Sequence, residues 1–159
     1  MTYEPVPPGA IGEGDVVQAS HYLQLEPVPH APGQARSFVR SHAPDLPQET
    51  VESLLLLTSE LVTNAVLHAR TTIRVGVVVG QEWIAVGVHD LDLMTGLQEP
   101  YADREGGWGH SLVSALAHSW STTRYPGGGK TVWFRLRRGD AHVVADGAAA
   151  RADADRRDA

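Results

Sequence analysis

The longest apolar stretch of the chain, LLLLTSELVTNAVLHA, runs from Leu54 to Ala69, and its apolar residues recur at the spacing of an α-helix. Within it, Glu60, Asn64 and His68 follow one another at intervals of four, which places them on one stripe of the helix surface. Because burying an unpaired carboxylate or amide is costly, this stripe must face water, a hydrogen-bonding partner or a bound ion. The pattern therefore indicates either the floor of a ligand site or the solvent-facing side of a surface helix.

Shorter periodic segments flank this helix. Alternating apolar residues in 71–79 and 83–90 predict two strands joined by a tight turn at Gly80-Gln81. The same criteria predict three further strands, at 21–25, 120–125 and 131–137. They also predict two short amphipathic helices, at 33–42 and 110–119. We therefore expect a two-layer α/β sandwich of the α+β type, with helices on one face of an antiparallel or mixed sheet.

The 159 residues suit one domain, which we place at 21–138. Residues 1–20 are rich in Pro and Gly and predict a mobile N-terminal arm, and 139–159 predict a disordered C-terminal tail. The net charge of −6 argues against direct nucleic-acid binding and against an anionic membrane surface. No cysteine, signal peptide or membrane-spanning run is evident, so we expect a cytoplasmic protein.

An acidic residue ends an otherwise apolar row in the second strand of the predicted hairpin. Ile84, Val86, Val88 and Asp90 share one face of this strand by the period of two. A strand-terminal aspartate either caps the following turn or supplies a specificity group at the mouth of a pocket. The sequence leaves both interpretations open.

The segment 91–106 lacks any sustained period, and a loop of this length is uncommon unless it covers or binds something. We interpret it as a lid. Gly107-Trp108-Gly109 then opens a helix, and glycines before a helix start let backbone N–H groups approach an anion closely. This combination suits phosphate.

Several familiar site motifs are excluded by their own spacing. The segment GGGKT at 127–131 is no P-loop, because Arg124 stands where the first glycine is required and a strand follows. A dinucleotide fingerprint fails at Leu112, where a third glycine is needed. The eight histidines form no close-spaced metal-ligand set, and no G-x-S-x-G elbow indicates a serine hydrolase.

The remaining motifs resemble those of a known superfamily. SELVTNAVLHA looks like the N box of the GHKL ATPases, which have a Bergerat-type ATP-binding fold. GGWGHSLVSALA followed by PGGGKTVWFRL is similar to the second glycine box and closing strand of the stand-alone anti-sigma-factor serine/threonine kinases. The resemblance covers residues 21–137.

The resemblance implies ATP and Mg²⁺ as ligands and a role for each matching residue. Asn64 would hold the Mg²⁺ that bridges the phosphates, and Glu60 would act as the base toward the attacking hydroxyl. Asp90 would accept a hydrogen bond from the adenine amino group. Gly107 and Gly109 would let the backbone approach the phosphates.

Two further positions complete the set of nucleotide-binding candidates. Thr131 would support the Asp90 end of the pocket, and His68 lies on the same helical stripe as the N-box residues. The chain departs from the superfamily at the first glycine box, where it reads Asp90-Leu-Asp-Leu-Met94 without the usual glycines. Asp92 is therefore a second candidate for the adenine contact.

The implied function is an ATP-dependent serine/threonine protein kinase that also sequesters a sigma factor. Its phosphate acceptor would be a small anti-anti-sigma protein, and the related proteins pair as homodimers. The missing first-box glycines motivate an alternative, a catalytically inactive, nucleotide-gated partner-binding module. A histidine-kinase transmitter fragment is disfavoured, because no helix with a phospho-acceptor histidine precedes the domain.

Overall fold

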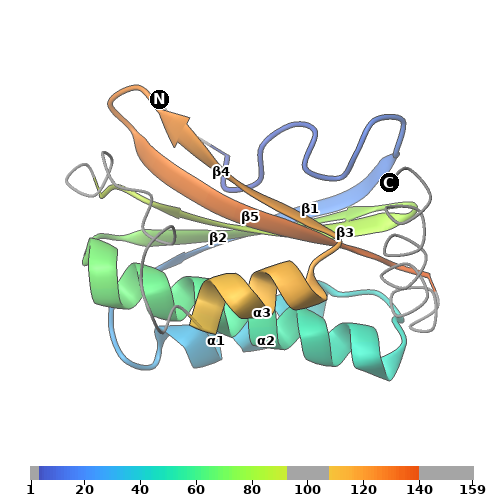
Figure 1. The fold of residues 1–159 in the computed structure, drawn as a ribbon, viewed down its shortest axis with the longest axis horizontal. Coiled ribbons are helices and arrows are strands. Elements are labelled where there is room, and N and C mark those ends of the chain that lie inside the picture. The colour runs from blue at the N-terminus through green and yellow to red at the C-terminus, as the bar shows by residue number, and fades with distance from the viewer. Residues whose placement is uncertain (1–3, 93–107, 140–159) are drawn as a thin grey trace, which may run out of the picture.

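The computed structural model describes residues 4–92 and 108–139, which form an open antiparallel sheet with helices packed on one face (Figure 1). Within these residues the sheet has five strands in the order β1-β2-β3-β5-β4. The strands are β1 (Val17–Leu25), β2 (Ile73–Gly80), β3 (Trp83–Asp90), β4 (Ser119–Tyr125) and β5 (Gly129–Arg137). The helices are α1 (Ala31–His42), α2 (Gln48–Asn64), a π-helical turn η1 (Ala65–Ala69) and α3 (Trp108–Leu116).

The core lies between the helices and one face of the sheet, as the apolar pattern predicted. Alternate residues of the three central strands, including Val77, Val86 and Phe134, are buried there against Leu54 and Leu57 of α2. Burying a side chain of this size stabilises the fold by about 1.5–3 kcal/mol. The two-layer α+β sandwich is confirmed, and every strand pairing described is antiparallel.

The continuous helix from Gln48 to Ala69 is 22 residues long, and by length and composition alone it could cross a membrane. Core helices pass the same test. Here Leu54, Leu57 and Leu61 pack into the core against the sheet, so burial within the domain accounts for the apolar composition of this helix face.

The opposite face of the sheet is covered by the N-terminal segment, residues 4–16, which packs against the strands where we predicted part of a mobile arm. Val6, Ala10 and Ile11 are buried in a second apolar cluster against the sheet. This close approach requires glycine at position 87, because a Cβ atom there would overlap the carbonyl oxygen of Pro5. Strand β1 also begins four residues earlier than predicted, at Val17. The predicted tail from 140 onward and most of the predicted lid (93–106) lie outside the described residues.

Asp15 fastens the end of this segment to the β2–β3 turn. Its carboxylate accepts hydrogen bonds from the backbone N–H groups of Gln81, Glu82 and Trp83 at 3.0 to 3.3 Å, and from its neighbour Val16 at 2.9 Å. A single side chain therefore satisfies the donors of a turn 66 residues away in sequence.

Replacing Asp15 by Ala is expected to lower the free energy of unfolding by about 1–3 kcal/mol, because several N–H groups lose a charged acceptor. Urea denaturation followed by circular dichroism measures the change. Glu13→Ala is the matched control, since it removes the same charge from an exposed side chain of the same segment. Equal effects of the two substitutions would assign the loss to charge alone and contradict the role of the hydrogen bonds.

Candidate functional site

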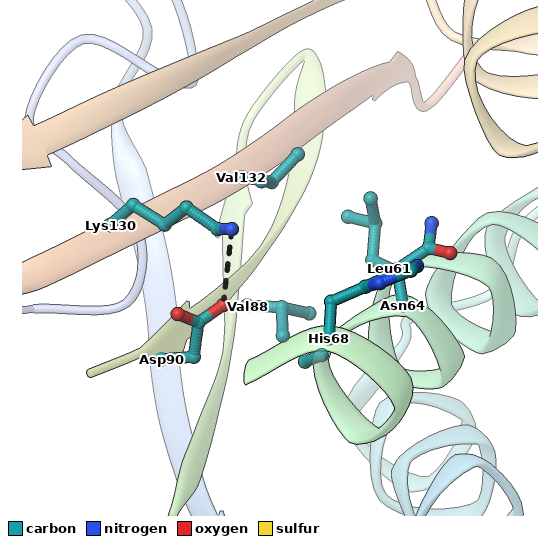
Figure 2. A pocket seen from close by; sticks show the side chains of 8 residues that line it. Leu61, Asn64, His68, Val88, Asp90, Lys130 and Val132 are labelled. Carbon is teal, nitrogen blue, oxygen red and sulfur yellow. Dashed lines mark ion pairs between the residues drawn. The ribbon is translucent and has the colours of Figure 1, made fainter. Parts of the chain in front are cut away.

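The end of the long helix and the end of β3 meet at a small pocket. Its cavity of about 10 Å³ is room for roughly one water molecule. Figure 2 shows the lining side chains, which come from the helix end on one side and from β3 and β5 on the other. The lining residues are Leu61, Asn64, Ala65, His68, Val88, Asp90, Lys130 and Val132.

Three of the predicted site residues are therefore brought together: Asn64, His68 and Asp90. Glu60 is half-buried one helical turn before Asn64 and does not line this cavity. Asp92 is buried but is also not part of the lining, so of the two candidates only Asp90 lines this cavity. The adenine contact itself stays a prediction.

The helix reaches Ala69 as predicted, but its last turn is a π-helix. In this turn the Arg70 N–H donates to the Ala65 carbonyl, at 3.3 Å and five residues back. Arg70 then adopts a left-handed conformation with φ of 54°, which ends the helix. Single π-turns are frequent at functional sites, and this one carries His68 at the pocket.

The side-chain amide of Asn64 carries a buried donor at the pocket. Its Nδ2 atom is buried and has no hydrogen-bond partner in the structure. Leaving such a group unsatisfied costs about 1–3 kcal/mol, a cost that native proteins rarely carry without a reason. The same amide offers an oxygen, which is the ligand type that Mg²⁺ prefers. Within the described part of the chain no cluster of three or more His, Asp or Glu side chains could hold a metal ion.

Asp90 is 3% exposed, and it both caps the following turn and lines the pocket. The turn-capping interpretation is confirmed, and its role as a specificity group stays a prediction. Its Oδ1 atom accepts a hydrogen bond from the Asp92 N–H at 3.0 Å. Burial raises the pKa of the Asp90 carboxyl, and this is opposed by the nearby Lys130 ammonium and by the Asp92 N–H. The second oxygen, Oδ2, lies 4.0 Å from Lys130 Nζ.

Lys130 is the site residue that the sequence analysis missed. It stands directly opposite Asp90 in the β3–β5 register, so both side chains leave the sheet on the helix side. The residue is only 4% exposed, although lysine is almost never buried unless it is paired. The signal in the sequence is the lysine of GGGKT itself, which has no assigned role once the P-loop is excluded.

Thr131 lies on the other face of the sheet, which corrects the expectation that it supports Asp90 within the pocket. It is opposite His89 in the register, and its hydroxyl lies 3.1 Å from His89 Nδ1. Its neighbour Lys130 takes the predicted place beside Asp90 instead. Gly129 has a φ of 81°, and a Cβ atom there would overlap the Asp90 carbonyl oxygen, so this turn requires glycine.

The predicted phosphate cradle is described only in part. Gly109 lies in the first turn of α3, which packs its Val113 into the core beside α2. Gly107 lies outside the described residues. The roles of both glycines toward phosphate therefore stay predictions.

Comparison with known proteins agrees with the motifs and with the architecture. A search of curated proteins finds no match to this chain. The sequence model of the histidine kinase-like ATPase domain matches residues 25–136, which contain all the helices, the strands β2 to β4 and all of β5 except its last residue, but only the last residue of β1. The matched region includes both the long helix and the strand pair that form the pocket. The chain therefore belongs to the histidine kinase-like ATPase domain family.

Proposed function

We propose that this protein is a cytoplasmic anti-sigma factor that uses ATP and Mg²⁺ to phosphorylate a serine or threonine of an anti-anti-sigma protein. The observation that carries the proposal is the position of Asn64, which lies one helical turn from Glu60, lines one pocket with Asp90 and has its Nδ2 atom buried without a partner. A metal ligand, a carboxylate and a base-reading acceptor are the parts that phosphoryl transfer needs most.

Each side chain has a separate task in this proposal. The Asn64 amide oxygen would hold Mg²⁺, which supplies neutralisation of the phosphate charge when bound. Asp90, when ionised, accepts only, and it would pair with the amino group of adenine. Glu60 would orient the acceptor hydroxyl and take its proton as the oxygen attacks the γ-phosphorus. The bond between that phosphorus and the β–γ bridging oxygen then breaks, and ADP leaves.

The partner assignment rests on the resemblance of the motifs to the stand-alone kinase branch. A sigma factor and an anti-anti-sigma protein are the proposed partners, and a homodimer is the proposed assembly. The outer edge of β1 is unpaired within the described residues, and Val17 and Tyr22 on this strand are exposed. This edge offers backbone groups to which a second chain could pair.

A second candidate function is a nucleotide-gated partner-binding module without catalysis. No glycine stands among residues 91–95, directly after Asp90, and the Asp92 N–H there is already used by the Asp90 carboxylate. The backbone at this point therefore donates to a side chain of the protein itself. Incubation with radiolabelled ATP and a partner co-purified from the native cytoplasm separates the two functions. Label on a serine or threonine supports the kinase, and a stable complex without label supports the binding module.

Mg·ATP at about 100 times its dissociation constant is expected to stabilise the protein by roughly 2.7 kcal/mol, which raises the melting temperature by about 5–10 °C. Differential scanning fluorimetry measures this shift. Adding EDTA should remove most of it, because Asn64 binds the phosphates only through the metal. No shift with Mg·ATP would contradict the nucleotide proposal, and a full shift in EDTA would contradict the role of Asn64.

A further inference from the structure

Lys130 is the most unusual side chain of the pocket. It is the only lysine in the sequence, and it is buried at the end of the cavity that Asp90 also lines. In Figure 2 its side chain extends from β5 to lie over the Asp90 carboxylate. Burying two opposite charges costs several kcal/mol per ion, which close geometry and further hydrogen bonds must offset.

The geometry of this ion pair is incomplete. The distance of 4.0 Å from Nζ to Oδ2 exceeds the 2.7–2.9 Å of a charge-assisted hydrogen bond. Asp90 Oδ1 is already engaged by the Asp92 N–H, so Oδ2 is the oxygen that faces Lys130. The pocket therefore presents one anionic acceptor and one cationic donor side by side, each with capacity for a further hydrogen bond.

A purine base carries the complementary pair on its six-position edge. Adenine offers the N6 amino group as donor and N1 as acceptor, whereas a 6-oxopurine offers O6 as acceptor and N1–H as donor. We propose that Lys130 is a second base-reading residue beside Asp90, and that the pocket accepts 6-oxopurine nucleotides such as GTP as well as ATP. The inference rests on the proposed nucleotide binding and adds to it the specificity of the base site.

The test compares dissociation constants for Mg·ATP and Mg·GTP by isothermal titration calorimetry. The wild type should bind the two nucleotides within about tenfold of each other, since one charge-assisted hydrogen bond is exchanged for another. Lys130→Met should weaken GTP binding by roughly a hundredfold, because O6 then has no donor in the pocket and lies near the Asp90 carboxylate, and ATP binding by roughly tenfold, because N1 loses its donor. Lys130→Gln keeps an N–H donor and should restore part of the loss for both.

Arg124→Met is the matched control. Arg124 is exposed and lies opposite Lys130 on β4, so this change removes a nearby cation without touching the pocket lining. It should leave both dissociation constants within about twofold, because exposed charges contribute little. If Lys130→Met binds the nucleotides as tightly as the wild type or more tightly, the proposal is overturned. The Lys130 side chain would then fill the pocket only in the free protein and leave it when a nucleotide binds. Wild-type binding of ATP with no binding of GTP would overturn it as well. Wild-type protein that binds neither nucleotide would overturn the proposed function too.

A second measurement needs no substitution. Because Lys130 is the only lysine, protein made with ¹³C,¹⁵N-lysine gives one set of lysine signals in NMR spectra. On addition of Mg·ATP or Mg·GTP, a nuclear Overhauser effect between the Lys130 ε-methylene and a base proton supports the proposal. A shift of the lysine signals to the values of a solvent-exposed lysine overturns it.

Discussion

Asn64→Ala is expected to weaken Mg·ATP binding by at least about a hundredfold while leaving the free protein as stable as the wild type or slightly more stable. The affinity falls because the substitution removes the proposed metal ligand. The remaining ligands of an Mg²⁺ site do not compensate for a missing one. The gain in stability follows from the structure. Nδ2 is buried without a partner, and alanine also favours a helix over asparagine by roughly 0.5 kcal/mol.

Two measurements on one sample check this prediction. Urea denaturation gives the free energy of unfolding, and calorimetric titration gives the dissociation constant. Thr63→Ala is the control, since Thr63 is the adjacent residue of the same helix and does not line the pocket. Retained affinity would remove Asn64 from the metal site. A loss of several kcal/mol of stability would show that the amide has a structural task, in which case the stripe Glu60-Asn64-His68 is not a binding surface.

The sheet and its helical cover were predictable because their patterns are local. Residues 73–79 and 84–90 alternate with the period of two, and the turn between them is short enough to fix an antiparallel pair. The long helix was equally clear from its length. These signals placed Asn64 and Asp90 at the ends of neighbouring elements, and the fold then brought them into one pocket.

The N-terminal segment was not predictable by the same means. Its composition of Pro and Gly excludes regular secondary structure, and from this alone the sequence predicts mobility. In the structure, Val6 and Ala10 are buried without helix or strand, against a sheet face opened by Gly76 and Gly87. The information lies in Gly76 and Gly87, which are 70 and 81 positions from Val6 in the sequence. Glycines within strands mark the close approach of another backbone.

The assignment of Thr131 was wrong for a different reason. In a strand, adjacent residues face opposite sides, so an error of one position moves a side chain to the other face of the sheet. The β3–β5 register pairs Asp90 with Lys130, and this pairing alone decides that Lys130 and not Thr131 enters the pocket. The resemblance of the closing strand to known motifs indicated a threonine near the glycines. It gave no information on which residue of β5 pairs with Asp90. The π-turn at Ala65–Ala69 had no distinct signal in the apolar spacing either.

Glu60→Gln is expected to lower the rate of phosphate transfer by roughly 10²–10⁴-fold, with the affinity for Mg·ATP within about threefold of the wild type. Glutamine keeps the size and the hydrogen-bonding oxygen of Glu60 but cannot accept the hydroxyl proton. Glu60 is half-buried and does not line the cavity shared by Asp90 and Lys130, so its loss should spare the base-binding end. Single-turnover transfer from radiolabelled ATP to the partner measures the rate, at nucleotide concentrations that saturate both proteins.

Glu52→Gln is the matched control, because Glu52 is an exposed residue of the same helix, two turns earlier. It should transfer phosphate at the wild-type rate. Wild-type transfer by Glu60→Gln would remove Glu60 as the base, and an equal loss of affinity and rate would make it a binding residue.

Together with Asn64→Ala, the Glu60→Gln variant separates the two candidate functions. A kinase loses transfer and binding with Asn64 but only transfer with Glu60, because positioning of the nucleotide and removal of the proton depend on different side chains. A nucleotide-gated binding module shows no transfer even in the wild type. Its partner affinity responds to Asn64→Ala and is unchanged by Glu60→Gln, since gating needs the bound nucleotide and no proton acceptor.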